Sequence, residues 1–347
     1  MILGLCLWGC SPPGLPLPPE ERVAVPGSGT VVVDVEAPKS IAGPLLKLFE
    51  SQTGITAQAT YLDPRRDDVV GRVKSDVAAG RADLVWAVSP LTAMALAEAG
   101  LTVPFRPAGA RPIPGQYRDP RFHWIGFAAD PRVIIYNSER LSHDEAPQSI
   151  EDLEGARWSG KVAMARIARG TAAFHAAALF TRWGAGPARA FFDKVRANGA
   201  RVVADDAEVI RLVASGEALW GFVDLDAAIA AKREAQPIHI FFPDRMALGA
   251  IVPPQVAVLL RGAPHPAQAK GLFAYFFETE AAYQLAQNDR ALVPLLPDIP
   301  KPDWVPSLPA FNVTQIDNQA VFQSYRDNAA YFESWGASVA PGDTPKP

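Results

Sequence analysis

Short apolar runs rich in β-branched residues alternate along the chain with longer segments in which apolar residues recur every three or four positions. The run from Thr30 to Asp34 predicts a buried strand. Ile41, Leu45 and Leu48 then recur at helical spacing until Gly54, which is a typical helix stop. Further strands are predicted at 56–61, 83–86, 133–136, 161–165, 202–203, 219–223, 238–242 and 256–260. This alternation predicts an α/β fold with mostly parallel sheets and flanking helices.

Capping residues mark several of the predicted helix starts. Ser40 is expected to cap the first helix, and Asp205 or Asp206 a later one. Asp317 is expected to cap one C-terminal helix with Val321, Tyr325, Ala329 and Phe332 on one stripe, which would brace a lobe.

The first residues, MILGLCLWGC, form an uncharged apolar run that is too short to span a bilayer as a helix, and they end at Cys10. Leu7 to Cys10 resembles the lipobox of bacterial lipoproteins, although Trp8 is bulky and no basic residue precedes the run. The resemblance implies a signal peptide at 1–9, lipid on Cys10 and a Pro-rich tether at 10–29. The alternative is a chance cysteine in an irregular N-terminus.

Composition and charge narrow the choice of function. The chain has 347 residues, 49% of them apolar, which is enough for two lobes with sizeable cores. Its net charge of −4 gives no basic field for nucleic acid. With Cys6 and Cys10 at the N-terminus, the predicted body has no thiol for disulfides or catalysis. The five histidines show no metal-binding spacing, and no Gly-x-Ser-x-Gly elbow is present.

A series of segments resembles, in order, the landmarks of bacterial periplasmic solute-binding proteins of ABC importers, with the ferric-ion-binding group as the nearest match. These segments are LLKLFESQTGITAQATY, ADLVWAVSP, HWIGFAADPRVIIYNSERL, WSGKVAMA, VASGEALWGFVD, RGAPHPAQAKGLFAYF and LVPLLP. The resemblance implies a type II periplasmic binding protein fold, with two lobes and crossover hinge strands, that closes over a small cargo. It also implies a monomeric, non-enzymatic receptor in the periplasm that delivers cargo to a membrane permease.

Lobe boundaries follow from this resemblance and from the irregular Pro- and Arg-rich stretch at 104–124. Residues 30–125, together with about 251–297, are expected to form lobe 1, and residues 126–250 lobe 2. Residues 298–347 are expected to form a C-terminal extension.

Ligands of open α/β sheets bind beyond the carboxyl ends of the strands, which directs attention to the loops after the predicted strands. Ferric members of the resembled group bind iron through adjacent tyrosines at the place where this chain has Asp224 and Asp226, so iron binding by a tyrosine pair is in doubt here. The two carboxylates suit a hard cation or an amine, and either one suits a helix cap. We expect one of them in the pocket and one at the cap.

Other strand-end loops supply the remaining candidates. Arg166, Arg169 and Thr171 precede or open a helix, and a helix N-terminus with an arginine fork attracts anions. Glu36, Lys39 and Ser89 lie in two further loops.

The prediction is therefore a lipid-anchored receptor without a cofactor for a small anionic or zwitterionic solute, or for ferric ion as cargo. An exported hydrolase and a lipoprotein sensory module are the alternatives.

Overall fold

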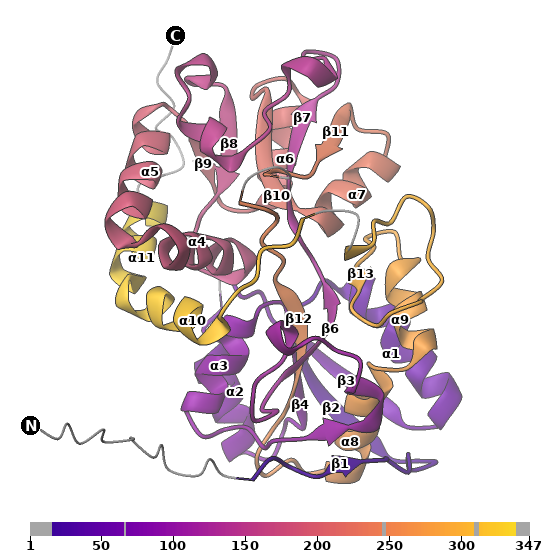
Figure 1. The fold of residues 1–347 in the computed structure, drawn as a ribbon. Helices are drawn as coiled ribbons and strands as arrows, with labels where there is room; N and C mark the ends of the chain where they lie inside the picture. Colours follow the sequence, from indigo (N-terminus) through magenta and orange to yellow (C-terminus); the bar gives the residue numbers. More distant parts are fainter. Residues whose placement is uncertain (1–15, 66, 245–247, 309–311, 338–347) are drawn as a thin grey trace, which may run out of the picture.

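The computed structural model describes residues 16–65, 67–244, 248–308 and 312–337, arranged as two lobes that are each built around one sheet (Figure 1). The predicted signal peptide and Cys10 lie outside the described residues. Within the described part of the chain, no helix combines the length and the apolar character needed to cross a bilayer. The mixed α/β architecture with two lobes agrees with the predicted fold class.

The first lobe contains a six-stranded sheet with the order β13-β6-β12-β4-β2-β3. Its three strands β2, β3 and β4 are parallel, as predicted from their βα alternation. The other three strands pair antiparallel. The strands are β2 (Thr30–Val35), β3 (Thr56–Tyr61), β4 (Leu84–Ala87), β6 (Ile125–Ala129), β12 (Pro254–Leu259) and β13 (Val293–Pro294).

The second lobe contains a five-stranded sheet with the order β11-β7-β10-β8-β9. Strands β8, β9 and β10 are parallel, whereas β7 pairs antiparallel with both β10 and β11. The strands are β7 (Arg132–Asn137), β8 (Val162–Ala165), β9 (Arg201–Val203), β10 (Trp220–Asp224) and β11 (Ile238–Phe241).

Crossovers between the lobes explain why β12 and β7 are antiparallel to their neighbours, since a chain that arrives from the other lobe enters the sheet from the opposite end. The first runs from β6 through Asp130 and Pro131 into β7, and the second runs from β11 to β12. The backbone N–H of Asp130 donates to the carbonyl of Pro253, 3.1 Å away, so the two crossovers are hydrogen-bonded to each other. Residues 126–129, placed in lobe 2 by the sequence division, lie in the sheet of the first lobe.

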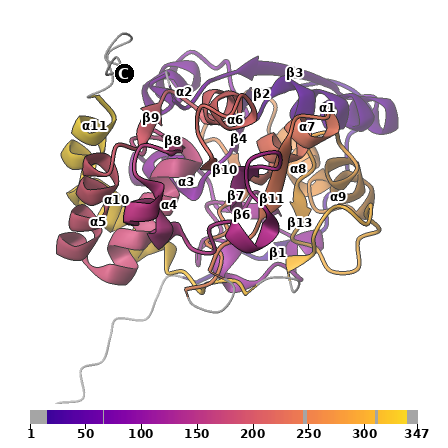
Figure 2. The ribbon, with the colours of Figure 1, turned by 90° about the horizontal axis from the view of Figure 1, so that it is seen from above.

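Helices cover both faces of the first sheet (Figures 1 and 2). Gly54 ends the first helix in the left-handed region, at φ 72°, as its position in the sequence predicts. Ser40 does not cap this helix, because the helix already begins at Lys39 with Pro38 at the N-cap. The helices are α1 (Lys39–Thr53), α2 (Val69–Ala78), α3 (Pro90–Glu98), α8 (Pro266–Tyr275) and α9 (Thr279–Ala286).

The second lobe has its own helices and a further pair contributed by the C-terminus. Asp205 caps α6 by accepting a hydrogen bond from the N–H of Glu208. The helices are α4 (Gly170–Trp183), α5 (Ala185–Ala197), α6 (Asp206–Ala214) and α7 (Leu225–Arg233). The 3-10 turns η3 (His143–Glu145), η4 (Ile150–Glu154) and η5 (Ala156–Trp158) also belong to this lobe, whereas η1 (Ala108–Ala110) and η2 (Gly115–Tyr117) precede β6 in the first lobe.

The C-terminal segment leaves the first lobe after β13 and forms two helices, α10 (Asn318–Asp327) and α11 (Ala329–Ala337), along the second lobe (Figure 1). Asp317 caps α10 as predicted, and α10 packs against α4. One continuous bracing helix was expected, but Asn328 ends α10 and α11 starts at the next residue.

Part of the segment predicted as a tether is docked on the first lobe. The short strand β1 (Glu20–Glu21) pairs in parallel with β5 (Arg106–Pro107). The carboxylate of Glu20 also forms an ion pair with Arg111. The backbone pairing and the ion pair hold residues 20–21 to the body of the protein.

Candidate functional site

A cleft of about 720 Å³ separates the two lobes and is lined by residues from both. Seven of the eight side chains predicted for a ligand site line this cleft, and Ser89 does not. The seven are Glu36, Lys39, Arg166, Arg169, Thr171, Asp224 and Asp226. The strand-end rule therefore places most of the predicted residues around one cavity.

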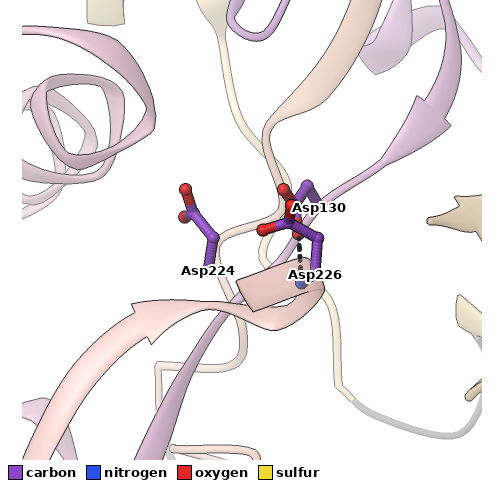
Figure 3. A group of neighbouring side chains, drawn as sticks. All are labelled: Asp130, Asp224 and Asp226. Atoms are coloured by element: carbon purple, nitrogen blue, oxygen red, sulfur yellow. Dashed lines mark hydrogen bonds between the residues drawn. The ribbon is translucent and has the colours of Figure 1, made fainter. Parts of the chain in front are cut away.

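Three carboxylates form an aspartate cluster, Asp130, Asp224 and Asp226, in which one oxygen of each lies within 4.8 Å of the others. Asp130 comes from the first crossover, Asp224 ends β10, and Asp226 lies in the first turn of α7. The N–H of Asp226 donates to the Asp130 carboxylate at 3.1 Å (Figure 3). We expected one of Asp224 and Asp226 to cap the helix, but the side chain of Asp224 makes no capping hydrogen bond although it occupies the N-cap position.

A buried arginine, Arg132, organises the side of the cluster that faces the second lobe. Its guanidinium donates to Asp224 Oδ1 and to the carbonyl of Phe222, at 2.8 Å in each case. It also pairs with Asp206 at 3.2 Å. The hydroxyl of Thr171 donates to the other oxygen of Asp224 at 2.6 Å. Asp224 is therefore held in place by two side-chain donors.

Arg290 supplies the second cation of the cluster, from the loop that follows α9 in the first lobe. Its guanidinium pairs with Asp226 of the second lobe at 2.9 Å, so this ion pair joins the lobes. With every group ionised, the four carboxylates of Asp130, Asp206, Asp224 and Asp226 face two guanidinium groups. Full ionisation would therefore leave two negative charges around the aspartate cluster without a cation beside them.

Burial raises the pKa values of the aspartate cluster. Desolvation raises the pKa of Asp224 to about 7, against the opposing effect of Arg132. The pKa of Asp130 lies well above its usual value because of burial and because Asp226 and Asp224 are close. Desolvation also raises the pKa of Asp226, although Arg290 opposes the shift. Such carboxylates are stabilised by protons, by hydroxyl or ammonium donors, or by a metal cation.

A basic part of the cleft lies beside the aspartate cluster, at the start of α4, where Thr171 is bonded to Asp224. The N-cap residue of this helix is Arg169, and no side chain caps the helix. Gly170, at φ 67°, provides the left-handed turn that leads into the helix. Arg166 and Arg169 are exposed, and the Arg169 guanidinium also donates to the carbonyl of Asp67 in the first lobe at 3.3 Å. Uncapped backbone N–H groups beside two arginines are suited to an anion.

The three candidates from the first lobe, Glu36, Lys39 and Ser89, differ in burial and in hydrogen bonding. The Glu36 carboxylate accepts hydrogen bonds from the N–H of Val88 and the hydroxyl of Thr92, both at 2.8 Å, and burial raises its pKa to about 7. Lys39 is exposed at the cleft. Ser89 was expected to donate to a ligand, but its buried hydroxyl accepts from the N–H of Leu91 and caps α3.

Sequence reasoning missed four charged residues of the site. Asp130 and Arg132 lie within the crossover segment GFAADPRVIIYN, where an acidic and a basic residue flank a proline between two apolar runs. Charged residues at such a break between two apolar runs could have indicated that Asp130 and Arg132 belong to the site. Asp206 was considered only as a cap, and Arg290 lies in a polar loop where the local sequence indicates nothing.

Comparison with known proteins places the chain within a family. The family model described as bacterial extracellular solute-binding protein matches residues 82–317. Iron uptake protein A1 of Synechocystis is 25% identical over 281 residues, which are 78% of this chain and 77% of that protein.

Solved structures share the fold at low sequence identity. Iron-bound HitA from Pseudomonas aeruginosa superimposes with a TM-score of 0.79 at 18% identity, over 89% of this chain and 99% of HitA. The periplasmic binding protein AfuA from Actinobacillus pleuropneumoniae, solved with fructose-6-phosphate, gives 0.72 at 16% identity, over 87% and 99%. The predicted two-lobed periplasmic binding protein fold is confirmed, and the prediction of a binding protein rather than an enzyme agrees with the family. The chain belongs to the bacterial extracellular solute-binding proteins.

Proposed function

We propose that this protein is the solute-binding component of an ABC importer and that its cargo is a small organic molecule with an anionic group at one end and hydroxyl or ammonium groups at the other. The observation that carries the proposal is the charge layout of the cleft. Its basic side lies at the start of α4, and its acidic side is the aspartate cluster. A cargo with two chemically different ends complements both sides.

The volume of the cleft favours an organic cargo over a bare ion. About 720 Å³ lies within the range of about 300–1,000 Å³ that is usual for small-molecule sites. A single metal ion fills only a small part of such a space. Because Thr171 at the start of α4 is bonded to Asp224, the aspartate cluster and the arginines line neighbouring parts of one cleft, and one organic molecule can contact both.

The anionic group would bind at the start of α4. Arg166 and Arg169 supply guanidinium forks, and the helix supplies uncapped N–H groups. A phosphate, phosphonate or carboxylate group has the matching chemistry. Lys39 adds a further positive charge from the first lobe.

The other end of the cargo would donate hydrogen bonds to the aspartate cluster. Hydroxyl and ammonium groups are donors, and the buried carboxylates are acceptors once they are ionised. Because the pKa of Asp224 is about 7, cargo binding would release protons below neutral pH, and affinity would increase as the pH rises toward 7.

Ferric ion with an accompanying anion is the second candidate. Three carboxylate oxygens within 4.8 Å of one another have the donor chemistry of a hard-cation site. The relative named Iron uptake protein A1 supports this reading. Against it stand the two guanidinium groups of Arg132 and Arg290 beside the cluster and the absence of a tyrosine from residues 223–228.

Calorimetric titration with fructose 6-phosphate, inorganic phosphate and ferric citrate tests the proposal, after native mass spectrometry of protein purified without refolding. We expect an organic anion to bind. The double variant Arg166→Gln, Arg169→Gln should bind it at least tenfold more weakly, because loss of even one hydrogen bond to a charged group costs about 1.5–3 kcal/mol. The control Arg182→Gln removes an exposed charge from the other end of α4 and should bind normally. Tight binding of iron, with rejection of organic anions, would overturn the proposal in favour of the second candidate.

The cellular role that we propose extends the predictions made for the N-terminus. A receptor held at the membrane by lipid on Cys10 would pass its cargo to an inner-membrane permease as a monomer. Replacement of Cys10 by Ala should release the protein from the membrane fraction without changing its affinity for cargo.

A further inference from the structure

The C-terminal helices contact the basic side of the cleft. The hydroxyl of Tyr325, on α10, donates to the carbonyl of Ala168 at 3.1 Å. Glu333, on α11, pairs with the guanidinium of Arg169 at 3.3 Å. Ala168 and Arg169 are neighbours in the loop of residues 166–169, which leads into α4 and which we call the arginine loop.

We propose that α10 and α11 are part of the binding apparatus: Tyr325 positions the arginine loop, and Glu333 is the counter-ion of Arg169 that an anionic cargo displaces. The inference rests on the proposed function, because it assigns the arginine loop to an anion. It adds two residues that lie more than 150 positions along the chain from that loop.

The support for Tyr325 is structural. Helix α10 packs on α4, and its residues Val321 and Phe322 are buried. The Tyr325 ring stacks on Phe332, with centroids 5.9 Å apart and planes 16° apart. A hydroxyl on a ring held in this way restrains the Ala168 carbonyl, and therefore the backbone between the two arginines.

The support for Glu333 is electrostatic. The side chain of Glu333 is 55% exposed and that of Arg169 is 42% exposed, so water screens their ion pair, which is therefore weak. A weak pair leaves Arg169 available to a cargo anion while holding the guanidinium near the cleft when the site is empty. The arrangement predicts that Glu333 lowers the affinity for anions.

Tyr325→Phe removes only the hydroxyl, and Tyr331→Phe is the matched control. The hydroxyl of Tyr331 donates to the carbonyl of Arg189 and to Asp193, both on α5, and does not contact the arginine loop. Amide hydrogen exchange without cargo reports on the loop directly. The N–H of Arg166 donates to Val203 O, and the N–H of Ala173 donates to Arg169 O. We expect both amides to exchange at least threefold faster in Tyr325→Phe and at the wild-type rate in Tyr331→Phe.

Titration of the same proteins with inorganic phosphate, at low ionic strength, tests the link to anion binding. We expect affinity about threefold to tenfold lower in Tyr325→Phe, as for loss of a neutral hydrogen bond. We expect it a few-fold higher in Glu333→Gln, and unchanged in Glu278→Gln, which removes an exposed charge outside the cleft lining.

The outcomes separate this inference from the proposed function. Phosphate binding that Tyr325→Phe leaves unchanged, with unchanged exchange, overturns the positioning role while the proposed anion site stands. Equal phosphate affinity in Glu333→Gln and wild type overturns the counter-ion role. Faster loop exchange in Tyr325→Phe without any phosphate binding supports the positioning of the loop, but it overturns both the counter-ion role and the assignment of the loop to an anion.

Discussion

Replacement of Asp224 by Asn tests whether ionisation of this buried carboxylate destabilises the fold. The substitution keeps the size of the side chain and removes its charge. Wild-type Asp224 accepts hydrogen bonds from Arg132 at 2.8 Å and from Thr171 at 2.6 Å. Despite these donors, burial raises its pKa to about 7, so the ionised form is disfavoured in the fold.

The sign and size of the effect follow from proton linkage. In the unfolded chain the pKa of an aspartate is about 3.9, so between about pH 4 and pH 7 the folded protein holds a proton that the unfolded chain has lost. Wild-type stability therefore decreases as the pH rises through this window. The two units between pH 5 and pH 7 correspond to about 2.7 kcal/mol at 1.36 kcal/mol per unit. Asn does not titrate, so the variant avoids this loss.

Urea unfolding of the cargo-free protein at pH 5 and pH 8, followed by tryptophan fluorescence, measures the difference. The stability of Asp224→Asn relative to wild type should improve by about 2–3 kcal/mol between pH 5 and pH 8. Asp289→Asn is the control, because the Asp289 side chain is 80% exposed. An identical stability difference at the two pH values would refute the reasoning, since it would show that Asp224 ionises freely in the fold.

Three further substitutions have distinct expected outcomes. Arg132→Gln leaves Asp206 and Asp224 without their shared cation and should lower the unfolding free energy by about 3–5 kcal/mol at pH 8 and by less at pH 5, which urea titration measures. Arg290→Gln removes the ion pair that joins the lobes at Asp226 and should increase the radius of gyration of the empty protein in small-angle X-ray scattering. Ser89→Ala should cost about 1 kcal/mol of stability through loss of the α3 cap, with unchanged cargo affinity in calorimetry.

The periodic pattern was sufficient for most of the fold because the central parallel strands β4 and β8 are buried along their whole length and therefore appear as apolar runs. Strand β6 was missed, since its sequence, IGFAA, contains one glycine and two alanines. The reason for the glycine is a tertiary one. A Cβ atom at Gly126 would lie 2.7 Å from the Cβ of Pro254 and 2.9 Å from the carbonyl oxygen of Tyr117. The need for glycine at this position therefore comes from β12 and from the segment around Tyr117, which are distant from or outside the local sequence pattern of β6.

The candidate site was predictable where topology alone determines position. Asp224 and Arg166 follow parallel strands, and the rule that ligands bind at strand ends places both at one cleft. The rule does not say which polar side chains already form hydrogen bonds within the protein and are therefore unavailable to a ligand. Ser89 also follows a strand, but its hydroxyl is used by α3. Arg290 and Asp226 are hydrogen-bonded although they are 64 positions apart in the sequence, and no local sequence pattern predicts this contact.

The position of the aspartate cluster links cargo binding to lobe closure. Asp130 lies on one crossover and its N–H is bonded to the other, so a group that contacts this carboxylate contacts the hinge itself. Asp226 belongs to the second lobe, and its partner Arg290 belongs to the first. A ligand shifts an open–closed equilibrium only through contacts that differ between the two states. Contacts to Asp130 alone would change little on closure, whereas contacts made at once to Asp226 and to Arg290 depend on how closely the lobes approach. A cargo that contacts first-lobe residues such as Lys39 or Arg290 together with the second lobe therefore favours the closed state, and a fragment that contacts the second lobe alone should bind without closing the lobes.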